Sequence, residues 1–120
     1  ELFRQYDALF DNGFSAFVCP TVTTTRIPAD FDFTTSKLVV DGQEVDPLTG
    51  WLLTPPFNLM YTIPVVNVPT GLAANRVPTG MQIATRSYDD LTAFQVAAAY
   101  EAAAPRFFTG DLMPDFRNSQ

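Results

Sequence analysis

The stretch from Phe57 to Arg86, FNLMYTIPVVNVPTGLAANRVPTGMQIATR, decides the fold of this chain. Two short runs within it have the composition of β-strands: residues 65–68, which are rich in valine, and residues 81–85, which follow a Pro-Thr-Gly turn. Residues 71–76 between them can reverse the chain but are too few for a crossover helix. The sequence therefore predicts an antiparallel hairpin.

Two glycines mark the ends of these predicted strands. Gly71 follows the first strand and Gly80 precedes the second. A residue without a Cβ atom is needed where a strand bulges or where another segment approaches the backbone closely. We therefore expect one of these features at each glycine.

The segments on either side of the hairpin predict helices. Leu2 to Asp11 place apolar side chains on one face, and the Gly13 that follows is typical of a helix C-terminus. Near the other end, the Ala-rich run of residues 91–104 predicts a second helix, which Ser87 or Asp89 can cap. The residues from Arg106 to Gln120 show no clear period, and we expect them to wrap over the body or to stay mobile.

An apolar run at residues 14–19, ended by Pro20, predicts a buried strand directly after the first helix. Helix, tight turn and strand form one half of an α/β unit. The predicted fold class is α/β, an α+β fragment with a mixed sheet and an antiparallel C-terminal hairpin flanked by helices. We expect residues 1–120 to form a single unit, because this length supports one domain at most.

The middle of the chain predicts a smaller accessory element. Residues 21–32 have the Thr, Pro and Asp content of a loop, and residues 35–46 predict an accessory hairpin with Asp41-Gly42 at its turn. An isolated hairpin is marginally stable, so we expect this one to lie on the main body. Residues 48–53 predict one or two helical turns that end at the following prolines.

Composition and charge exclude several classes of function. A net charge of −6, with 7 basic residues and no basic cluster, argues against binding to nucleic acid. No stretch approaches the roughly 20 apolar residues of a membrane span, so no membrane partner is expected. A single cysteine excludes an internal disulfide framework and fits a reducing, cytoplasmic location. The N-terminal residues have no signal-peptide order, and the chain reads as part of a longer protein.

Catalytic groups and cofactor motifs are missing from the sequence. There is no histidine, and one cysteine without histidine leaves no usual zinc site, so no metal is predicted. Phosphate-binding and dinucleotide-binding glycine motifs are absent, and no cofactor is predicted. We interpret Cys19 as a small hydrophobe, Lys37 as a strand-edge lysine, and Asp89 and Asp90 as helix-capping residues. The sequence therefore predicts no catalytic residue.

Four residues are candidates for a substrate-binding role. Asn58 and Gln82 are amides in apolar stretches, where they either satisfy backbone groups or border a substrate pocket. Thr21 and Val22 follow the predicted strand that contains Cys19, and α/β sheets bind ligands beyond the carboxyl ends of strands. For Asn58 and Gln82, the sequence does not decide between satisfying backbone groups and bordering a pocket.

The hairpin stretch also resembles a known family. The pattern Asn-Leu-x-x-x-x-Pro-x-x-x-Val-Pro-x-Gly, followed by Pro-x-Gly-x-Gln-Ile, looks like the C-terminal end of the amidase signature family. It falls on Asn58, Leu59, Pro64, Val68, Pro69, Gly71, Pro78, Gly80, Gln82 and Ile83, and an upstream helix–strand segment also matches at Asp7, Leu9, Pro20 and Thr21. Two departures stand out: at Tyr61-Thr62-Ile63 the usual glycine is missing, and Thr85 occupies a second usual glycine position.

The resemblance implies a serine-type amide hydrolase. Members of this family use a nucleophilic Ser, a bridging Ser on a cis peptide and a Lys base, and none of these three residues lies in this chain. The implied function is the C-terminal portion of such an enzyme, acting on a small-molecule amide through an acyl-enzyme in the full-length protein. The segment alone is expected to be inactive and to self-associate through the surface that the longer protein would cover.

The sequence is also compatible with two alternatives to a hydrolase. The same residues fit part of a transamidase subunit of this family. A different class, a non-catalytic α+β binding or assembly module that shares only the hairpin, would use its apolar surface as a partner interface.

Overall fold

The computed structural model describes residues 1–107 of the chain, so the tail expected to wrap or move lies outside the described residues from position 108 onward. The described part contains these elements in chain order: α1 (Leu2–Asp11), β1 (Phe17–Pro20), β2 (Leu38–Val40), β3 (Gln43–Val45), α2 (Pro55–Leu59), β4 (Val65–Leu72), β5 (Pro78–Ala84) and α3 (Asp90–Ala103).

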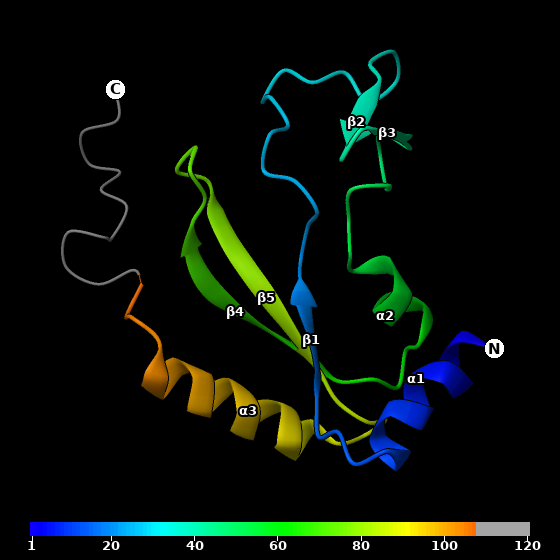
Figure 1. Ribbon diagram of the computed structural model, residues 1–120, viewed down its shortest axis with the longest axis vertical. Coiled ribbons are helices and arrows are strands. Elements are labelled where there is room, and N and C mark those ends of the chain that lie inside the picture. Colours follow the sequence, from blue (N-terminus) through cyan, green and yellow to red (C-terminus); the bar gives the residue numbers. More distant parts are fainter. Residues whose placement is uncertain (108–120) are drawn as a thin grey trace.

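The main sheet has three strands in the order β1-β5-β4, with β5 in the centre (Figure 1). The predicted α/β class and the antiparallel hairpin are confirmed, since β4 pairs with β5 in antiparallel register from Val65↔Ala84 to Leu72↔Pro78. The main sheet differs in one respect from the mixed sheet that the sequence predicts. β1 and β4 run in the same direction, but β5 lies between them, so each hydrogen-bonded pair of this sheet is antiparallel.

Both glycines behave as the sequence predicts. The register shifts between Pro69 and Gly71, and Gly71 has a φ of +122°, which favours glycine. A Cβ atom on Gly80 would lie 2.8 Å from the side-chain oxygen of Asn67. Because the bulge lets pairing resume beyond Pro69, both strands extend further toward the hairpin tip than their apolar runs indicate.

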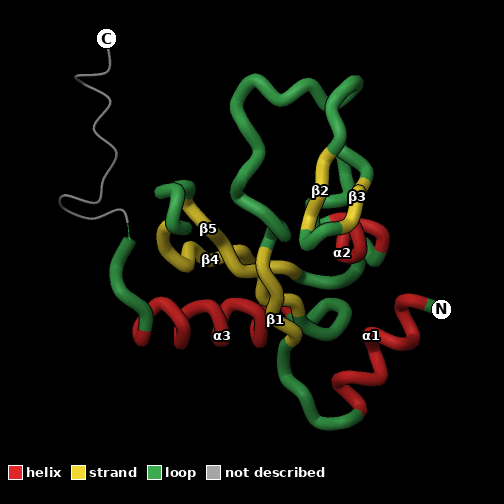
Figure 2. Tube along the Cα trace, turned by 45° about the horizontal axis from the view of Figure 1, so that its top comes forward, coloured by secondary structure: helices red, strands yellow, loops and turns green. Residues whose placement is uncertain are grey.

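The two faces of the sheet carry separate hydrophobic clusters. Ile83 packs with Val68 and with Ala97 of α3 on one face. Its neighbour Ala84 packs with Tyr6 of α1 and Phe57 of α2 on the other face, because successive side chains of a strand point to opposite sides. Figure 2 shows α3 running alongside β4 and β5, with α1 on a different side of the sheet. Ile83 and Ala84 are both fully buried, so the centre of the fold lies on β5.

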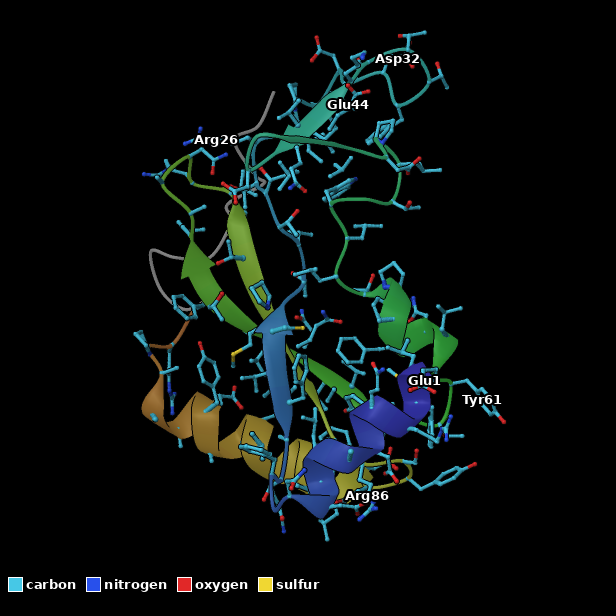
Figure 3. All side chains as sticks on the ribbon, turned by 45° about the vertical axis from the view of Figure 1, so that its right-hand side comes forward. Glu1, Arg26, Asp32, Glu44, Tyr61 and Arg86 are labelled. Carbon is cyan, nitrogen blue, oxygen red and sulfur yellow. The ribbon has the colours of Figure 1, made fainter. Side chains whose placement is uncertain are left out.

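Long-range hydrogen bonds hold α1 against the end of β5. The Tyr6 hydroxyl donates to the backbone oxygen of Thr85 at 3.0 Å. Arg86 pairs with Asp7 at 3.1 Å and with Asp11 at 2.7 Å, and Figure 3 places Arg86 beside α1. These contacts join the first helix to residues about 75–79 positions away in sequence, which anchors the N-terminal segment on the sheet.

The prediction of a buried strand at residues 14–19 is wrong in its burial and its bounds. β1 spans Phe17–Pro20, and Phe17 and Val18 are 38% and 52% exposed. In residues 1–107, β1 pairs only with β5, so one of its edges is open and its apolar side chains are covered on one side alone. Pro20 is tolerated there because an edge strand has positions whose N–H is not needed for pairing.

The helical turns expected before the double proline are displaced. Pro55 and Pro56 do not end a helix but begin α2, whose first turn needs no backbone N–H donors at these positions. The second hairpin is present, with β2 and β3 joined by Asp41 and Gly42 at φ +50° and +78°, as its Asp-Gly turn indicates.

The last helix begins as predicted. The Asp89 side chain accepts a hydrogen bond from the backbone N–H of Thr92 at 3.2 Å, which caps α3. The helix ends before Pro105. Among the residues described, no helix is both long enough and apolar enough to cross a membrane.

Candidate functional site

A groove of about 630 Å³ lies where β1 ends against the outer half of the β4–β5 hairpin. One wall comes from β1 and the loop that follows it, and the other from facing positions of β4 and β5. The lining residues are Val18, Cys19, Pro20, Val22, Thr23, Thr24, Thr25, Arg26, Thr70, Thr79, Gly80 and Met81. Apolar side chains therefore line the part beside β1, and threonines with one arginine line the part beyond it.

The loop wall of the groove is fixed to the hairpin at two points. The backbone N–H of Thr21 donates to the Gly80 oxygen at 3.2 Å, next to the end of β1. Further along, the Asn75 side chain donates to the Thr25 backbone oxygen at 2.7 Å, and the Thr25 hydroxyl donates back to Asn75 at 3.3 Å. The loop therefore spans from the strand to the hairpin tip with both ends held.

A second set of contacts supports this loop from behind. Val22 forms an antiparallel bridge with Leu52, flanked by a hydrogen bond from the Thr23 N–H to the Trp51 oxygen at 2.9 Å. The Leu53 N–H donates to the Thr21 oxygen at 3.0 Å. The segment before α2 thus acts as a short extra strand beside the loop.

The side chain of Gln82 connects three segments: β5, the end of β1 and the segment before α2. Its side chain is on β5 and only 3% of the residue is exposed. Its amide nitrogen donates to the backbone oxygens of Pro20 at 3.0 Å and Leu53 at 3.2 Å, and lies 3.4 Å from the Cys19 sulfur. One side-chain amide therefore connects β5, the end of β1 and the segment that leads into α2.

Cys19 is half-buried beside this amide. Burial raises the pKa of the Cys19 thiol, and the hydrogen bond from Gln82 opposes that rise. Burial also raises the pKa of the nearby Tyr6 phenol. A raised pKa keeps the thiol protonated at neutral pH, and the thiol is a poor nucleophile in that form. This supports the interpretation of Cys19 as a packing residue.

The four residues that the sequence singles out are not gathered at one place. Val22 lines the groove, and Thr21 anchors the same loop to Gly80. Gln82 lies behind the groove wall as a connecting group, which fits the backbone-satisfying alternative for that amide. Asn58 is exposed on α2 and is not among the groove-lining residues.

Three residues of the groove are not among those that the sequence singles out: Arg26, Asn75 and Met81. Met81 and Arg26 line the groove, and Asn75 fixes its outer end. The run Thr-Val-Thr-Thr-Thr-Arg at residues 21–26 is the signal that could have identified this wall, because hydroxyl side chains at that density offer many hydrogen-bonding groups.

Two further kinds of site were considered from the sequence, a reactive lysine and a metal site. Lys37 lies in the accessory hairpin region and pairs with Glu44 at 2.9 Å, in agreement with a strand-edge role. In the described part of the chain, no three His, Cys, Asp or Glu side chains gather in a way that could hold a metal ion. What the groove provides for a ligand is a concave surface with apolar side chains, threonine hydroxyls and one arginine.

We predict that Gln82→Leu lowers the free energy of unfolding by about 1–3 kcal/mol, because the Pro20 and Leu53 oxygens lose their side-chain donor in a buried place. The matched control, Gln95→Leu at an exposed position of α3, should change it by less than about 0.5 kcal/mol. Urea denaturation followed by circular dichroism measures both. Equal effects from the two variants would show that Gln82 does not hold these segments together.

Two comparisons with known proteins agree with this picture, and no family model matches the chain. The chain is 34% identical over 97 residues to an acylamidase of Rhodococcus erythropolis, a match that covers 80% of this chain and 20% of the relative. It is 41% identical over 97 residues to a glutamyl-tRNA(Gln) amidotransferase subunit of Bacillus thuringiensis (strain Al Hakam), covering 78% of this chain and 18% of that protein.

A solved structure matches the fold as well. It is the crystal structure of a bacterial aryl acylamidase that belongs to the amidase signature enzymes, with a TM-score of 0.74 and 30% identity over 88% of this chain and 21% of that one. The chain thus spans about a fifth of the length of each of these relatives. In sequence and in fold, this chain is a homologue of one segment of the amidase signature family.

Proposed function

We propose that the chain is the C-terminal portion of an amide-hydrolysing enzyme of the Ser-Ser-Lys type and forms part of the wall of its substrate pocket. The observation that carries this proposal is the joint likeness in sequence and fold to two acylamidases, at 34% and 30% identity. The groove beside β1 supports the assignment to a pocket wall, since it combines apolar surface with a few polar groups.

In this proposal the bond-making groups lie outside the chain. The nucleophilic Ser of the longer protein attacks the amide carbon, the amine leaves, and water then hydrolyses the acyl-enzyme. The Lys moves the proton through the bridging Ser. The residues of this chain hold the substrate: Val18 and Met81 contact its apolar part, and the anchored loop from Thr21 to Thr25 limits its position.

The two departures from the family pattern, at Thr62 and Thr85, lie away from the groove. The Thr62 hydroxyl lies 3.0 Å from the Ser87 hydroxyl, and the Thr85 hydroxyl donates to the Asp89 oxygen at 2.8 Å. Both threonines therefore bond to the connection between β5 and α3, and neither is among the groove-lining residues. At both positions, the residue that replaces the usual glycine therefore belongs to this connection and not to the groove wall.

A transamidase subunit is the second candidate. The 41% identity to a glutamyl-tRNA(Gln) amidotransferase subunit favours it. A cytoplasmic location is compatible with either candidate. Release of ammonia from glutamine by the longer protein would favour the transamidase, and release of an aromatic amine from an acyl anilide would favour the hydrolase.

We predict that purified residues 1–120 release neither ammonia from glutamine nor amine from acyl anilides, because in this proposal the nucleophilic Ser, the bridging Ser and the Lys base lie outside the chain, and its one lysine pairs with Glu44. The complete reading frame that contains this sequence should hydrolyse amides. Its kcat/KM should fall by more than about tenfold in Val18→Asp, which puts a charge into the apolar part of the groove.

Leu48→Asp is the control for that variant, because Leu48 is 62% exposed and lies outside the groove. Its kcat/KM should stay near the unsubstituted value. Turnover by the 120-residue chain that survives repurification, or an inactive complete protein that is correctly folded, would contradict the proposed function.

We also propose that the chain alone self-associates. Its large exposed apolar side chains include Phe14 at 62%, Leu91 at 69% and Phe94 at 64%, and the outer edges of β1 and β4 are unpaired within residues 1–107. Exposed apolar patches and open strand edges both favour association.

We expect light scattering to show oligomers whose mass grows with concentration between about 10 and 500 µM, as mass action requires. Phe94→Glu should reduce the association, and Glu101→Gln on an exposed part of the same helix should not. A strictly monomeric chain across this range would refute self-association without bearing on the proposed enzyme.

A further inference from the structure

The groove beside β1 is built from parts of the chain that contain no acidic residue. All of its lining residues fall within 18–26 and 70–81. The surrounding sequence from Asn12 to Ala29, and from Pro47 to Tyr88, has neither Asp nor Glu, although the chain has 13 acidic residues and a net charge of −6. The local charge of this region is therefore opposite in sign to that of the whole chain.

Of the three cations in this region, Arg86 pairs with Asp7 and Asp11 of α1, and the other two, Arg26 and Arg76, lie toward one end of the groove. Arg26 lines the groove, and Arg76 lies at the tip of the β4–β5 hairpin with a φ of +65°. The bonds between Thr25 and Asn75 bring the backbones of these two arginines to the same end, since each arginine directly follows one of the bonded residues. Figure 3 shows Arg26 near the loop that joins β4 to β5.

Neither arginine is neutralised by a carboxylate in the described structure. Arg4, Lys37 and Arg86 each form an ion pair with an acidic side chain. Within residues 1–107, Arg26 and Arg76 form none. An unneutralised guanidinium group that lines a partly apolar groove, with a second arginine on the neighbouring hairpin tip, is suited to bind an anion. Planar carboxylates match the guanidinium donors in geometry.

We propose that this groove binds an amphipathic carboxylate, with the apolar body against Val18 and Met81 and the carboxylate at Arg26 and Arg76. The binding preference is a property of this chain. The identification of the ligand as substrate rests on the proposed function: the enzyme would then act on amides that carry a carboxylate remote from the amide bond.

A pair of dyes tests the preference directly. 1-Anilinonaphthalene-8-sulfonate and N-phenyl-1-naphthylamine share one apolar body, and only the first is an anion. Arg26→Gln should weaken binding of the anionic dye by about threefold, and Arg26→Gln/Arg76→Gln by about tenfold, while binding of the neutral dye stays unchanged. Raising the salt concentration should weaken only the anionic dye. 4-Phenylbutyrate should displace this dye, and 4-phenylbutyramide should not.

Arg106→Gln is the matched control, since Arg106 lines a separate groove between α3 and β4 and forms no ion pair within residues 1–107. It should leave both dyes unaffected. The proposal is overturned if Arg106→Gln weakens the anionic dye and the Arg26 variants do not, or if all variants bind both dyes equally. Because this assay needs no turnover, it succeeds or fails independently of amide hydrolysis by the complete enzyme.

Discussion

The side-chain amide of Gln82 links three segments that are far apart in the sequence: β5, the end of β1 and the segment before α2. β5 is the only strand of the main sheet with a neighbour on each edge in the described residues, and its Ile83 and Ala84 face the two hydrophobic clusters. From this strand the Gln82 nitrogen reaches the Pro20 and Leu53 oxygens. Burying an amide is favourable only when its hydrogen bonds are made, so these segments are held in one arrangement.

The groove follows from that arrangement. With the end of β1 and the segment before α2 fixed, the loop from Thr21 to Thr25 spans from the end of β1 to the hairpin tip, where Asn75 holds its far end. A groove wall built in this way is held at both ends, by Gly80 and by Asn75, and is polar toward the hairpin tip. This agrees with the pocket-wall role that we propose, in which the wall orients a substrate.

The hairpin can be predicted because its signals are local: valines, flanking prolines and glycines at the positions that bulge or come close to another segment. The start of α2 cannot be placed from sequence, because two prolines end one helix or begin the next equally well, and tertiary packing of Phe57 decides between them. Of the candidate site, Val22 and Thr21 are reachable from the position of a strand end. The Thr25–Asn75 contact spans 50 residues, and no local pattern encodes such a pairing, although the absence of acids around it is visible in the sequence.

Native-state hydrogen exchange tests the central place of β5 most directly. If the account is right, the amides of Gln82, Ile83 and Ala84 exchange only through global unfolding, while those of Leu38 to Val45 in the accessory hairpin exchange through local opening at lower free energy. Amides of β5 that exchange as easily as those of the hairpin would contradict the account, because the strand would then not be the element on which the groove and the rest of the fold depend.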